Sequence, residues 1–233
     1  MVGISIGGYI PTSFLDFPGA AAAVVFTKGC RFRCPFCHNP ELVAMKGETK
    51  PIPAEQILED LRKRKKFLDG VCISGGEPTI QPELIPFLDS IRAQGLKIKL
   101  DTNGARPDVL EHVLESGKTD YIAMDVKAPW EKYPLASGWD GNFEAVMKSI
   151  SLLLGSKTAF EFRTTLVPGI HSLEDACFMG KMIEGAPLYV LQNFRPGHTL
   201  SQEFSDRRPF PPEFLEAFRE IAAPFAGEVR IRG

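Results

Sequence analysis

Short apolar runs with strong β propensity alternate along this chain with segments of helical periodicity. The runs lie at residues 22–27, 71–74, 97–101, 121–125, 160–166 and 188–192. They are mostly unbroken by polar residues, as expected for strands buried on both faces of a parallel sheet. Repeated strand–helix units imply parallel strands joined by right-handed crossovers, so the pattern predicts an α/β fold, a partial (β/α)6 TIM-like barrel. A doubly wound open sheet is the alternative, because strand order cannot be read from the sequence.

The segments between these runs predict amphipathic helices, each with one apolar stripe. The helices are expected at residues 53–66, at 84–91 with Pro82 in the first turn, at 109–114 after Pro107, at 143–154, after the capping box Ser172-Leu173-Glu174-Asp175, and at 214–221.

Composition sets limits on the class of protein. The chain has 233 residues, of which 44% are hydrophobic, and a formal net charge of −2. These values and the absence of a low-complexity linker predict one domain over residues 1–233. Nothing in the charge points to a nucleic-acid partner, and no apolar run is long enough to predict a membrane span. The first residues lack the basic and apolar regions of a signal peptide, so we expect a cytoplasmic protein.

Three cysteines, Cys30, Cys34 and Cys37, form a C-x3-C-x2-C pattern with no fourth cysteine nearby. A [4Fe–4S] cluster normally takes four cysteines, so three would leave one iron open for chemistry. A zinc site with His38 as fourth ligand is an alternative, although adjacent residues rarely bind one zinc ion. A disulfide framework does not suit a chain of this size with five cysteines. The remaining cysteines are expected to be small core residues: Cys72 and Cys177.

A polar motif follows each predicted strand. After the cysteine loop come Ser74-Gly75-Gly76-Glu77-Pro78, Asp101-Thr102-Asn103-Gly104, Asp125-Val126-Lys127, Val167-Pro168-Gly169 and Asn193-Phe194-Arg195-Pro196-Gly197. In a barrel these loops share the face formed by the carboxyl ends of the strands, where active sites are built. Each motif alone is more often a turn or a surface charge, and the prediction of a site rests on their joint occurrence.

These motifs together suit a zwitterionic ligand that carries a sugar. The glycine pair lets the backbone approach a ligand closely, Glu77 suits an ammonium group, and Lys127 suits a carboxylate. Asp101, Asn103 and Asp125 offer acceptors for hydroxyls or an amine. S-adenosylmethionine (SAM) has an amino group, a carboxylate and a sugar.

The cysteine triplet, the Gly75-Gly76-Glu77-Pro78 motif and the order of strands and helices resemble the radical SAM superfamily over nearly the whole chain. The resemblance implies a barrel of the radical SAM type and a [4Fe–4S] cluster on Cys30, Cys34 and Cys37. It implies that SAM binds the open iron and is cleaved by one electron to methionine and a 5′-deoxyadenosyl radical. This radical would take a hydrogen atom from the substrate. The open iron implies that the reduced cluster reacts with oxygen, so an anaerobic oxidoreductase is expected.

Three segments narrow the resemblance to the glycyl-radical-enzyme activases, and most of all to the longer anaerobic ribonucleoside-triphosphate reductase activating proteins. They are Ile10-Pro11-Thr12-Ser13-Phe14-Leu15-Asp16-Phe17-Pro18-Gly19, Phe26-Thr27-Lys28-Gly29-Cys30 and Cys37-His38-Asn39-Pro40-Glu41-Leu42. This resemblance implies a glycyl radical enzyme as protein substrate, one glycine Cα of which loses a hydrogen atom. It also implies flavodoxin or ferredoxin as electron donor.

The family pattern, carried over by position, assigns the cofactor contacts. Phe36 would border the adenine, Gly75, Gly76 and Glu77 would hold the amino group, and Asp125 and Lys127 would meet the carboxylate end. The full candidate set is Phe36, His38, Gly75, Gly76, Glu77, Asp101, Asn103, Asp125, Val126, Lys127, Arg163 and Arg195. The ribose contact stays open between Asn193 and Arg195. The same comparison suggests a monovalent cation near Asp101 and Asp125.

Two other functions stay open at this point. One is a radical SAM enzyme that acts on a small molecule, and the other is an iron–sulfur electron carrier or redox sensor that cleaves nothing. The basic run at residues 62–66 invites docking of an acidic electron donor, but a solvated helix face is the simpler interpretation. His112 and His171 are expected at the surface or at helix caps.

Replacing any one of Cys30, Cys34 and Cys37 with Ala should abolish the intact cluster, because each thiolate is predicted to bind an iron. Iron content and the EPR spectrum of the reduced protein measure this. A variant with normal iron content and a normal spectrum would show that the ligand assignment is wrong.

Overall fold

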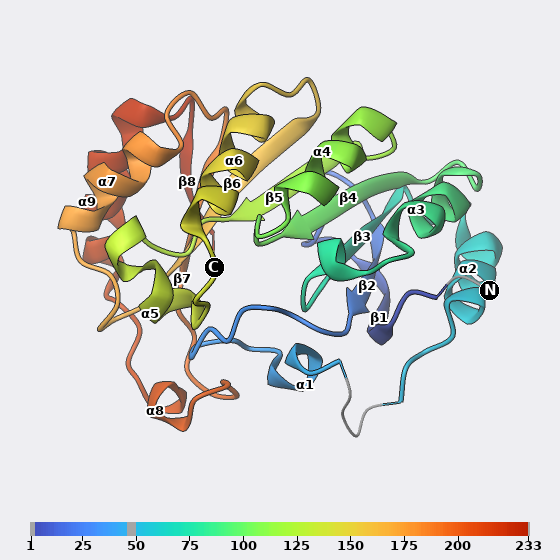
Figure 1. The fold of residues 1–233 in the computed structure, drawn as a ribbon, viewed down its shortest axis with the longest axis horizontal. Helices are drawn as coiled ribbons and strands as arrows, with labels where there is room; N and C mark the ends of the chain where they lie inside the picture. Colours follow the sequence, from blue (N-terminus) through green and yellow to red (C-terminus); the bar gives the residue numbers. More distant parts are fainter. Residues whose placement is uncertain (1–2, 46–49, 233) are drawn as a thin grey trace.

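The computed structural model describes residues 3–45 and 50–232, which form one curved sheet of eight strands with helices around it (Figure 1). The strands are β1 (Ile6–Ser13), β2 (Ala22–Thr27), β3 (Gly70–Gly75), β4 (Lys97–Thr102), β5 (Tyr121–Asp125), β6 (Ala159–Leu166), β7 (Tyr189–Asn193) and β8 (Val229–Arg232). They lie in the sheet in the order of the sequence. Strands β2 to β8 are parallel, and β1 runs antiparallel to β2.

This sequential order decides between the two predicted topologies. A doubly wound sheet reverses its strand order at a switch point, and no reversal occurs here. The partial barrel is therefore confirmed and the doubly wound alternative is wrong. The edge strands β1 and β8 are not paired with each other within the described ranges, so the barrel is open along one side.

Helices cover the outer side of the sheet, from α2 at the right of Figure 1 to α9 at the left. The helices are α1 (Pro40–Val43), α2 (Ala54–Arg64), α3 (Leu84–Arg92), α4 (Pro107–Ser116), α5 (Tyr133–Ser137), α6 (Phe143–Leu154), α7 (Glu174–Met182), α8 (Gln202–Ser205) and α9 (Pro212–Ala222). Three 3-10 turns are η1 (Pro78–Ile80), η2 (Trp130–Lys132) and η3 (Ala223–Phe225). Among the described residues, no helix combines the length and apolar character needed to cross a bilayer.

The predicted helices form where their apolar stripes and caps place them. Asn142 caps α6 by accepting a hydrogen bond from the backbone N–H of Glu144 at 2.8 Å, and the apolar stripe of α6 buries Val146, Ile150 and Leu153. The predicted capping box of α7 forms in one half, because the Asp175 carboxylate accepts the backbone N–H of Ser172 at 2.8 Å.

The differences from the sequence prediction concern short or edge elements. β1 contains two glycines and Pro11, and its register is irregular between Ile10 and Ser13, so it lacks an apolar strand pattern. β8 has four residues, and α1, α5 and α8 have four or five, which is too short for a periodicity to show. Helix α3 begins at Leu84, not at Pro82, because η1 occupies the preceding segment.

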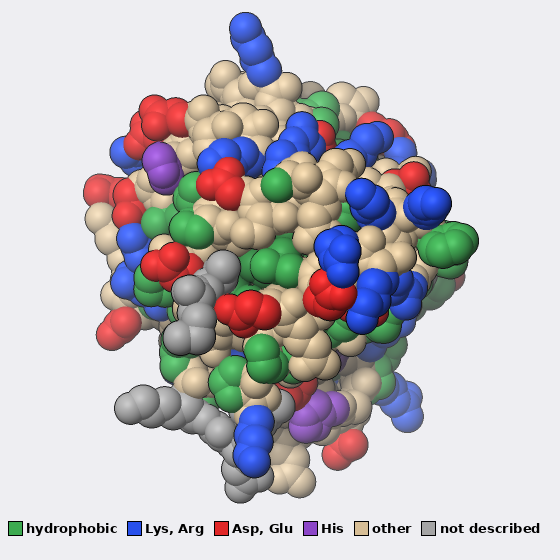
Figure 2. Space-filling model, turned by 90° about the vertical axis from the view of Figure 1, so that its right-hand side faces the viewer, with side chains coloured by type: hydrophobic (Ala, Val, Ile, Leu, Met, Phe, Trp, Pro, Cys, Tyr) green, Lys and Arg blue, Asp and Glu red, His purple; other side chains and the backbone are tan. Residues whose placement is uncertain are grey.

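Salt bridges within α2 partly neutralise the basic run at residues 62–66. Glu59 pairs with Arg62 at 2.8 Å and with Lys63 at 3.5 Å, and Arg64 lies 3.9 Å from a carboxylate oxygen of Asp60. Figure 2 views the side of the molecule that lies at the right of Figure 1, and it shows acidic and basic side chains interspersed there. These contacts fit the interpretation of a solvated helix face.

The last strand is attached through a buried carboxylate. Glu161 on β6 is fully buried and accepts two hydrogen bonds from the Arg232 guanidinium on β8, at 3.2 and 3.1 Å. The Tyr121 hydroxyl on β5 donates a third, at 3.1 Å. Three strands of the sheet are therefore joined at one side chain.

Arg232→Met should lower the free energy of unfolding by about 3 kcal/mol, because it removes the charged partner of a buried carboxylate. Arg230→Met is the matched control on the same strand, since its partner Glu228 is exposed, and it should cost less than about 1 kcal/mol. Urea denaturation of both variants measures the difference. Equal losses would contradict a special role for Glu161.

Candidate active site

A cavity of about 330 Å³ lies at the carboxyl ends of the parallel strands. Side chains from the cysteine loop after β2, the glycine loop after β3 and the ends of β4 to β7 line it. Most of the predicted site residues are among them: Cys30, Cys34, Phe36, Cys37, His38, Gly75, Gly76, Glu77, Asp101, Asn103, Asp125, Lys127 and Arg163. The structure thus brings into one cavity residues that are widely separated in the sequence.

Val126 and Arg195 are not part of the cavity lining. Val126 is buried, and its backbone bonds to β6 through the carbonyl of Arg163 at 2.8 Å and the hydroxyl of Thr164 at 2.7 Å. The Arg195 side chain is exposed. Asn193, the other candidate for the ribose, is bonded to the backbone of Phe210 at 2.8 and 3.2 Å. The residues of β6 and β7 that line the cavity near these positions are Thr165 and Gln192.

Backbone hydrogen bonds hold the cysteine loop in place at both ends. The N–H of Gly29 donates to Leu42 at 2.6 Å, and the N–H of Cys30 donates to Val43 at 3.0 Å. At the far end, the carbonyls of Pro35 and Cys37 accept the N–H groups of Ser201 and Leu200 at 2.9 and 3.0 Å. The segment that leads into α8 therefore clamps the loop.

Aromatic side chains anchor the same loop. Phe32 packs against Tyr133 and Trp139, with ring centroids 6.1 and 5.1 Å apart, and Phe36 packs against Phe204 at 6.5 Å. Phe32 and Phe36 are both nearly fully buried. The apolar residues between the cysteines thus fix the loop conformation, which leaves the thiols to face the cavity.

The three thiols suit a bound cationic metal centre. Cys34 is buried and Cys30 and Cys37 are half-buried, and none of the three is in a disulfide. Burial raises the pKa of the Cys30 thiol to about 12 and that of Cys34 to about 11, and it also raises the pKa of Cys37. Without a metal these thiols stay protonated at neutral pH, so metal binding must displace their protons.

Among the described residues, Cys30, Cys34, Cys37 and His38 are not grouped as the ligands of a single zinc ion would be. Across residues 3–45 and 50–232, no three His, Cys, Asp or Glu side chains are arranged to hold one metal ion. In a [4Fe–4S] cluster each thiolate binds a different iron, so the sulfurs surround a cavity without meeting at a point. His38 is also engaged elsewhere, because its Nε2 lies 2.7 Å from the carbonyl oxygen of Arg195 and its ring stacks on Phe194.

The carboxylate of Glu77 connects the glycine loop to the loop after β4. One oxygen accepts hydrogen bonds from the Thr79 N–H at 3.1 Å, the Thr79 hydroxyl at 2.6 Å and the Thr102 hydroxyl at 2.7 Å. The other accepts the backbone N–H of Asn103 at 2.7 Å. Burial raises the pKa of Glu77 against the effect of these bonds. Glu77 therefore holds two loops together, and its contact with an ammonium group stays a prediction.

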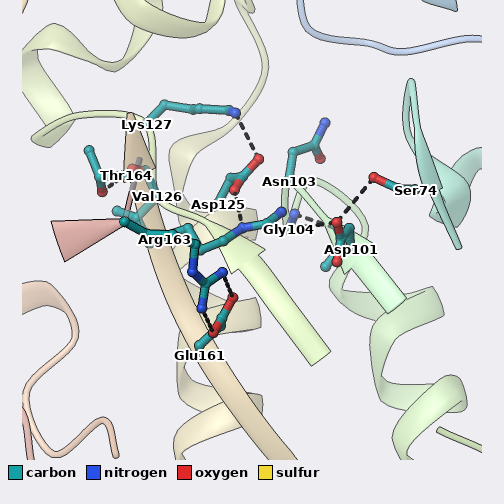
Figure 3. Close-up of polar contacts among 12 residues, drawn as sticks. Ser74, Asp101, Asn103, Gly104, Asp125, Val126, Lys127, Glu161, Arg163 and Thr164 are labelled. Atoms are coloured by element: carbon teal, nitrogen blue, oxygen red, sulfur yellow. Dashed lines mark hydrogen bonds and ion pairs between the residues drawn. The ribbon is translucent and has the colours of Figure 1, made fainter. Parts of the chain in front are cut away.

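A network of ionised groups joins β4, β5 and β6 (Figure 3). Arg163 donates to Asp125 at 3.0 Å and to Asp101 at 3.2 Å, and Lys127 donates to the second oxygen of Asp125 at 2.9 Å. Lys99 forms an ion pair with Asp101. Burial alone would raise the pKa of both carboxyls, but the cations outweigh it and hold each pKa below its usual range. Both carboxylates therefore stay ionised at neutral pH, and the stability that they contribute is lost progressively as the pH falls from the ordinary carboxyl pKa towards these lowered pKa values.

Several lining residues were not predicted from the sequence. Asp16 reaches the cavity from the loop between β1 and β2, and Thr165 and Gln192 reach it from β6 and β7. The contact of Lys99 with Asp101 could have been predicted, because Lys99 lies two residues before Asp101 and alternate residues of a strand share a face. His171, which was predicted at the surface or at a helix cap, is buried just before α7, and its ring lies 2.9 Å from the backbone of Val167 and of Lys127. Of the other cysteines, Cys72 is buried as predicted, whereas Cys177 is half-buried on α7.

Gly76→Ala should weaken cluster binding and lower the melting temperature, because an added Cβ would overlap the carbonyl oxygen of Gly29, next to Cys30. Gly155→Ala is the control, since the closest atom to its Cβ is a carbonyl oxygen at 3.5 Å. Iron content after reconstitution and thermal unfolding measure the effect. Full iron loading in Gly76→Ala would contradict close packing of the two loops.

Comparisons with known proteins agree with this geometry. A sequence model of the radical SAM superfamily matches residues 24–176. MJ1227 of Methanocaldococcus jannaschii, assigned as a glycyl-radical enzyme activating enzyme, is 34% identical over 97% of this chain and 95% of its own length. The pyruvate formate-lyase-activating enzyme of Listeria monocytogenes is 34% identical over 92% of this chain and 91% of its own.

Solved structures share the fold. TYW1 with a lysine-pyruvate adduct superposes with a TM-score of 0.66 at 18% identity, over 88% of this chain and 74% of that one. Coproporphyrinogen III oxidase (HemN) of Escherichia coli, a radical SAM enzyme, superposes with a TM-score of 0.61 at 15% identity, over 87% of this chain and 51% of that one. The chain belongs to the radical SAM superfamily and, within it, to the glycyl-radical enzyme activating enzymes.

Proposed function

We propose that this protein acts as a single domain that binds a [4Fe–4S] cluster on Cys30, Cys34 and Cys37 and binds SAM beside it. We further propose that it generates a glycyl radical on a partner enzyme. The observation that supports this most is that three thiols, the glycine loop and the Asp125–Lys127 pair line one cavity at the carboxyl ends of parallel strands. A cluster that only transfers electrons would not need the glycine loop or the Asp125–Lys127 pair beside it.

The residues of the chain divide the binding of SAM among them. Gly75 and Gly76 offer backbone carbonyls to the amino group, and Glu77 keeps their loop against Asn103. Lys127, whose pKa is raised by Asp125 despite burial, stays charged and attracts the carboxylate. Phe36 borders the adenine, and Thr165 and Gln192 are available to the ribose.

Cys30, Cys34 and Cys37 would hold the cluster, which when reduced would supply the one electron needed to cleave SAM to methionine and a 5′-deoxyadenosyl group. A glycine Cα of the partner would then give a hydrogen atom to the 5′ carbon of that group, so that 5′-deoxyadenosine and a glycyl radical would result. The part of the chain in this step is to hold the acceptor carbon and the glycine together and to exclude water.

The partner that we propose first is anaerobic ribonucleoside-triphosphate reductase. The support is the resemblance of the segment at residues 10–19 and of the cysteine loop to its activating proteins. A pyruvate formate-lyase is the second candidate, favoured by the identity shared with the activating enzyme of Listeria monocytogenes. A flavodoxin or ferredoxin is the proposed electron donor.

The test is anaerobic reconstitution, reduction and addition of SAM, with each candidate partner in turn. We expect 5′-deoxyadenosine together with the EPR doublet of a glycyl radical on one of the two partners. Cys34→Ala, which should lack the intact cluster, should give neither product. Formation of 5′-deoxyadenosine with no doublet on either partner would point to a small-molecule substrate. No 5′-deoxyadenosine from a loaded, reduced protein would favour the electron-carrier function.

A further inference from the structure

The carboxylates of Asp101 and Asp125 stand on neighbouring strands at the cavity, and one side chain joins them. Arg163 lies on β6, directly opposite Asp125 in the register of β5 and β6. Its Nε donates to Asp125 at 3.0 Å, and its Nη1 reaches across to Asp101 at 3.2 Å. The Arg163 side chain is largely buried, so water screens these contacts little. One guanidinium therefore bridges β4, β5 and β6.

All four oxygens of the two carboxylates already have donors. Asp101 receives Lys99 on one oxygen and, on the other, Arg163 and the Ser74 hydroxyl at 3.1 Å. Asp125 receives Arg163 on one oxygen and Lys127 at 2.9 Å on the other. A metal ion between these carboxylates would share their oxygens with three charged donors that the fold holds in place.

The balance of charge also opposes a further cation. Lys99, Arg163 and Lys127 contribute three positive charges, and Asp101 and Asp125 contribute two negative charges, so the network carries one net positive charge. A monovalent cation would raise the net charge of a buried site to two. An anion, in contrast, would bring it to zero. The network thus suits a carboxylate ligand and not a metal ion.

We propose that Arg163 is an internal cation that positions Asp125 and Lys127 for an anionic ligand and takes the place of the monovalent cation suggested by the family resemblance. The residues present do not fit such an ion, because three side-chain cations already outnumber the two carboxylates. Lys99 assists by neutralising Asp101 from the barrel interior, where its side chain is almost fully buried. The protein should then need neither Na⁺ nor K⁺ for ligand binding. The identity of the anion as the carboxylate of SAM rests on the proposed function.

The first test uses the wild-type protein. Thermal unfolding of the unloaded protein and SAM affinity of the reconstituted protein are measured in NaCl, KCl and choline chloride at equal ionic strength. We expect the same melting temperature and the same affinity in all three salts. A rise in either quantity that is specific to Na⁺ or K⁺ would overturn the proposal. The melting temperature does not depend on SAM chemistry. An ion-specific rise in melting temperature would therefore overturn this proposal without bearing on the proposed function.

The second test removes the internal cation. Arg163→Met should weaken SAM affinity by about tenfold or more, since it removes two charge-assisted hydrogen bonds. It also leaves the network with no net charge, so Na⁺ or K⁺, but not choline, should restore part of the lost affinity and raise the melting temperature. Arg163→Lys keeps the charge but cannot span both carboxylates, so it should lose less SAM affinity than Arg163→Met.

Arg92→Met is the matched control, because Arg92 also pairs with an aspartate, Asp120, but at the opposite end of β5. It should leave SAM affinity and the response to salts unchanged. Unchanged affinity in Arg163→Met, or a loss that no alkali cation relieves in a folded variant, would each contradict the role of Arg163. If Arg163→Met does not fold, Arg163→Lys and the wild-type salt series still decide the question.

Discussion

The site depends first on the buried carboxylate of Glu77. Its four donors lie in the turn that follows it, at the end of β4 and in the loop after β4, so it joins two loops that would otherwise be independent. The second of these loops reaches the cysteine loop, because the Asn103 side-chain amide lies 3.6 Å from the sulfur of Cys30. Gly76 meanwhile lies against the backbone of Gly29. The cysteine loop is thus braced by contacts that originate at one acidic side chain.

A second buried system, centred on Arg163, joins β4, β5 and β6. The system around Glu77 and the network around Arg163 differ in the charge that they present to a ligand. Around Glu77 neutral donors surround a single carboxylate, whereas the network around Arg163 has one positive charge in excess. A ligand with an ammonium group and a carboxylate would meet opposite electrostatic environments at its two ends, which favours one orientation over its reverse. Orientation matters here because the proposed reaction requires one carbon atom to face the partner.

How much of this could be predicted from the sequence depends on the range of the interactions. The six apolar runs identify β2 to β7, and the glycine and aspartate motifs at their ends identify most of the cavity lining, because both are local patterns. The ion pairs could not be predicted in the same way. The contact between Arg163 and Asp125 follows from strand register, and the one between Arg163 and Asp101 follows from the curvature that brings β4 and β6 together. Neither the register nor the curvature can be predicted from the sequence of a single strand.

The choice of residues in the network follows from that curvature. On the inner side of a closing sheet, polar side chains from three adjacent strands converge in a space with little water, where unpaired charges are costly. A mobile ion can neutralise converging carboxylates, but it must be bound each time, and its occupancy depends on the medium. A guanidinium attached to the neighbouring strand is always present, and its planar fork spans two acceptors at once. Because strand register places Arg163 opposite Asp125, the guanidinium supplies the positive charge between the carboxylates, and no external ion is needed there.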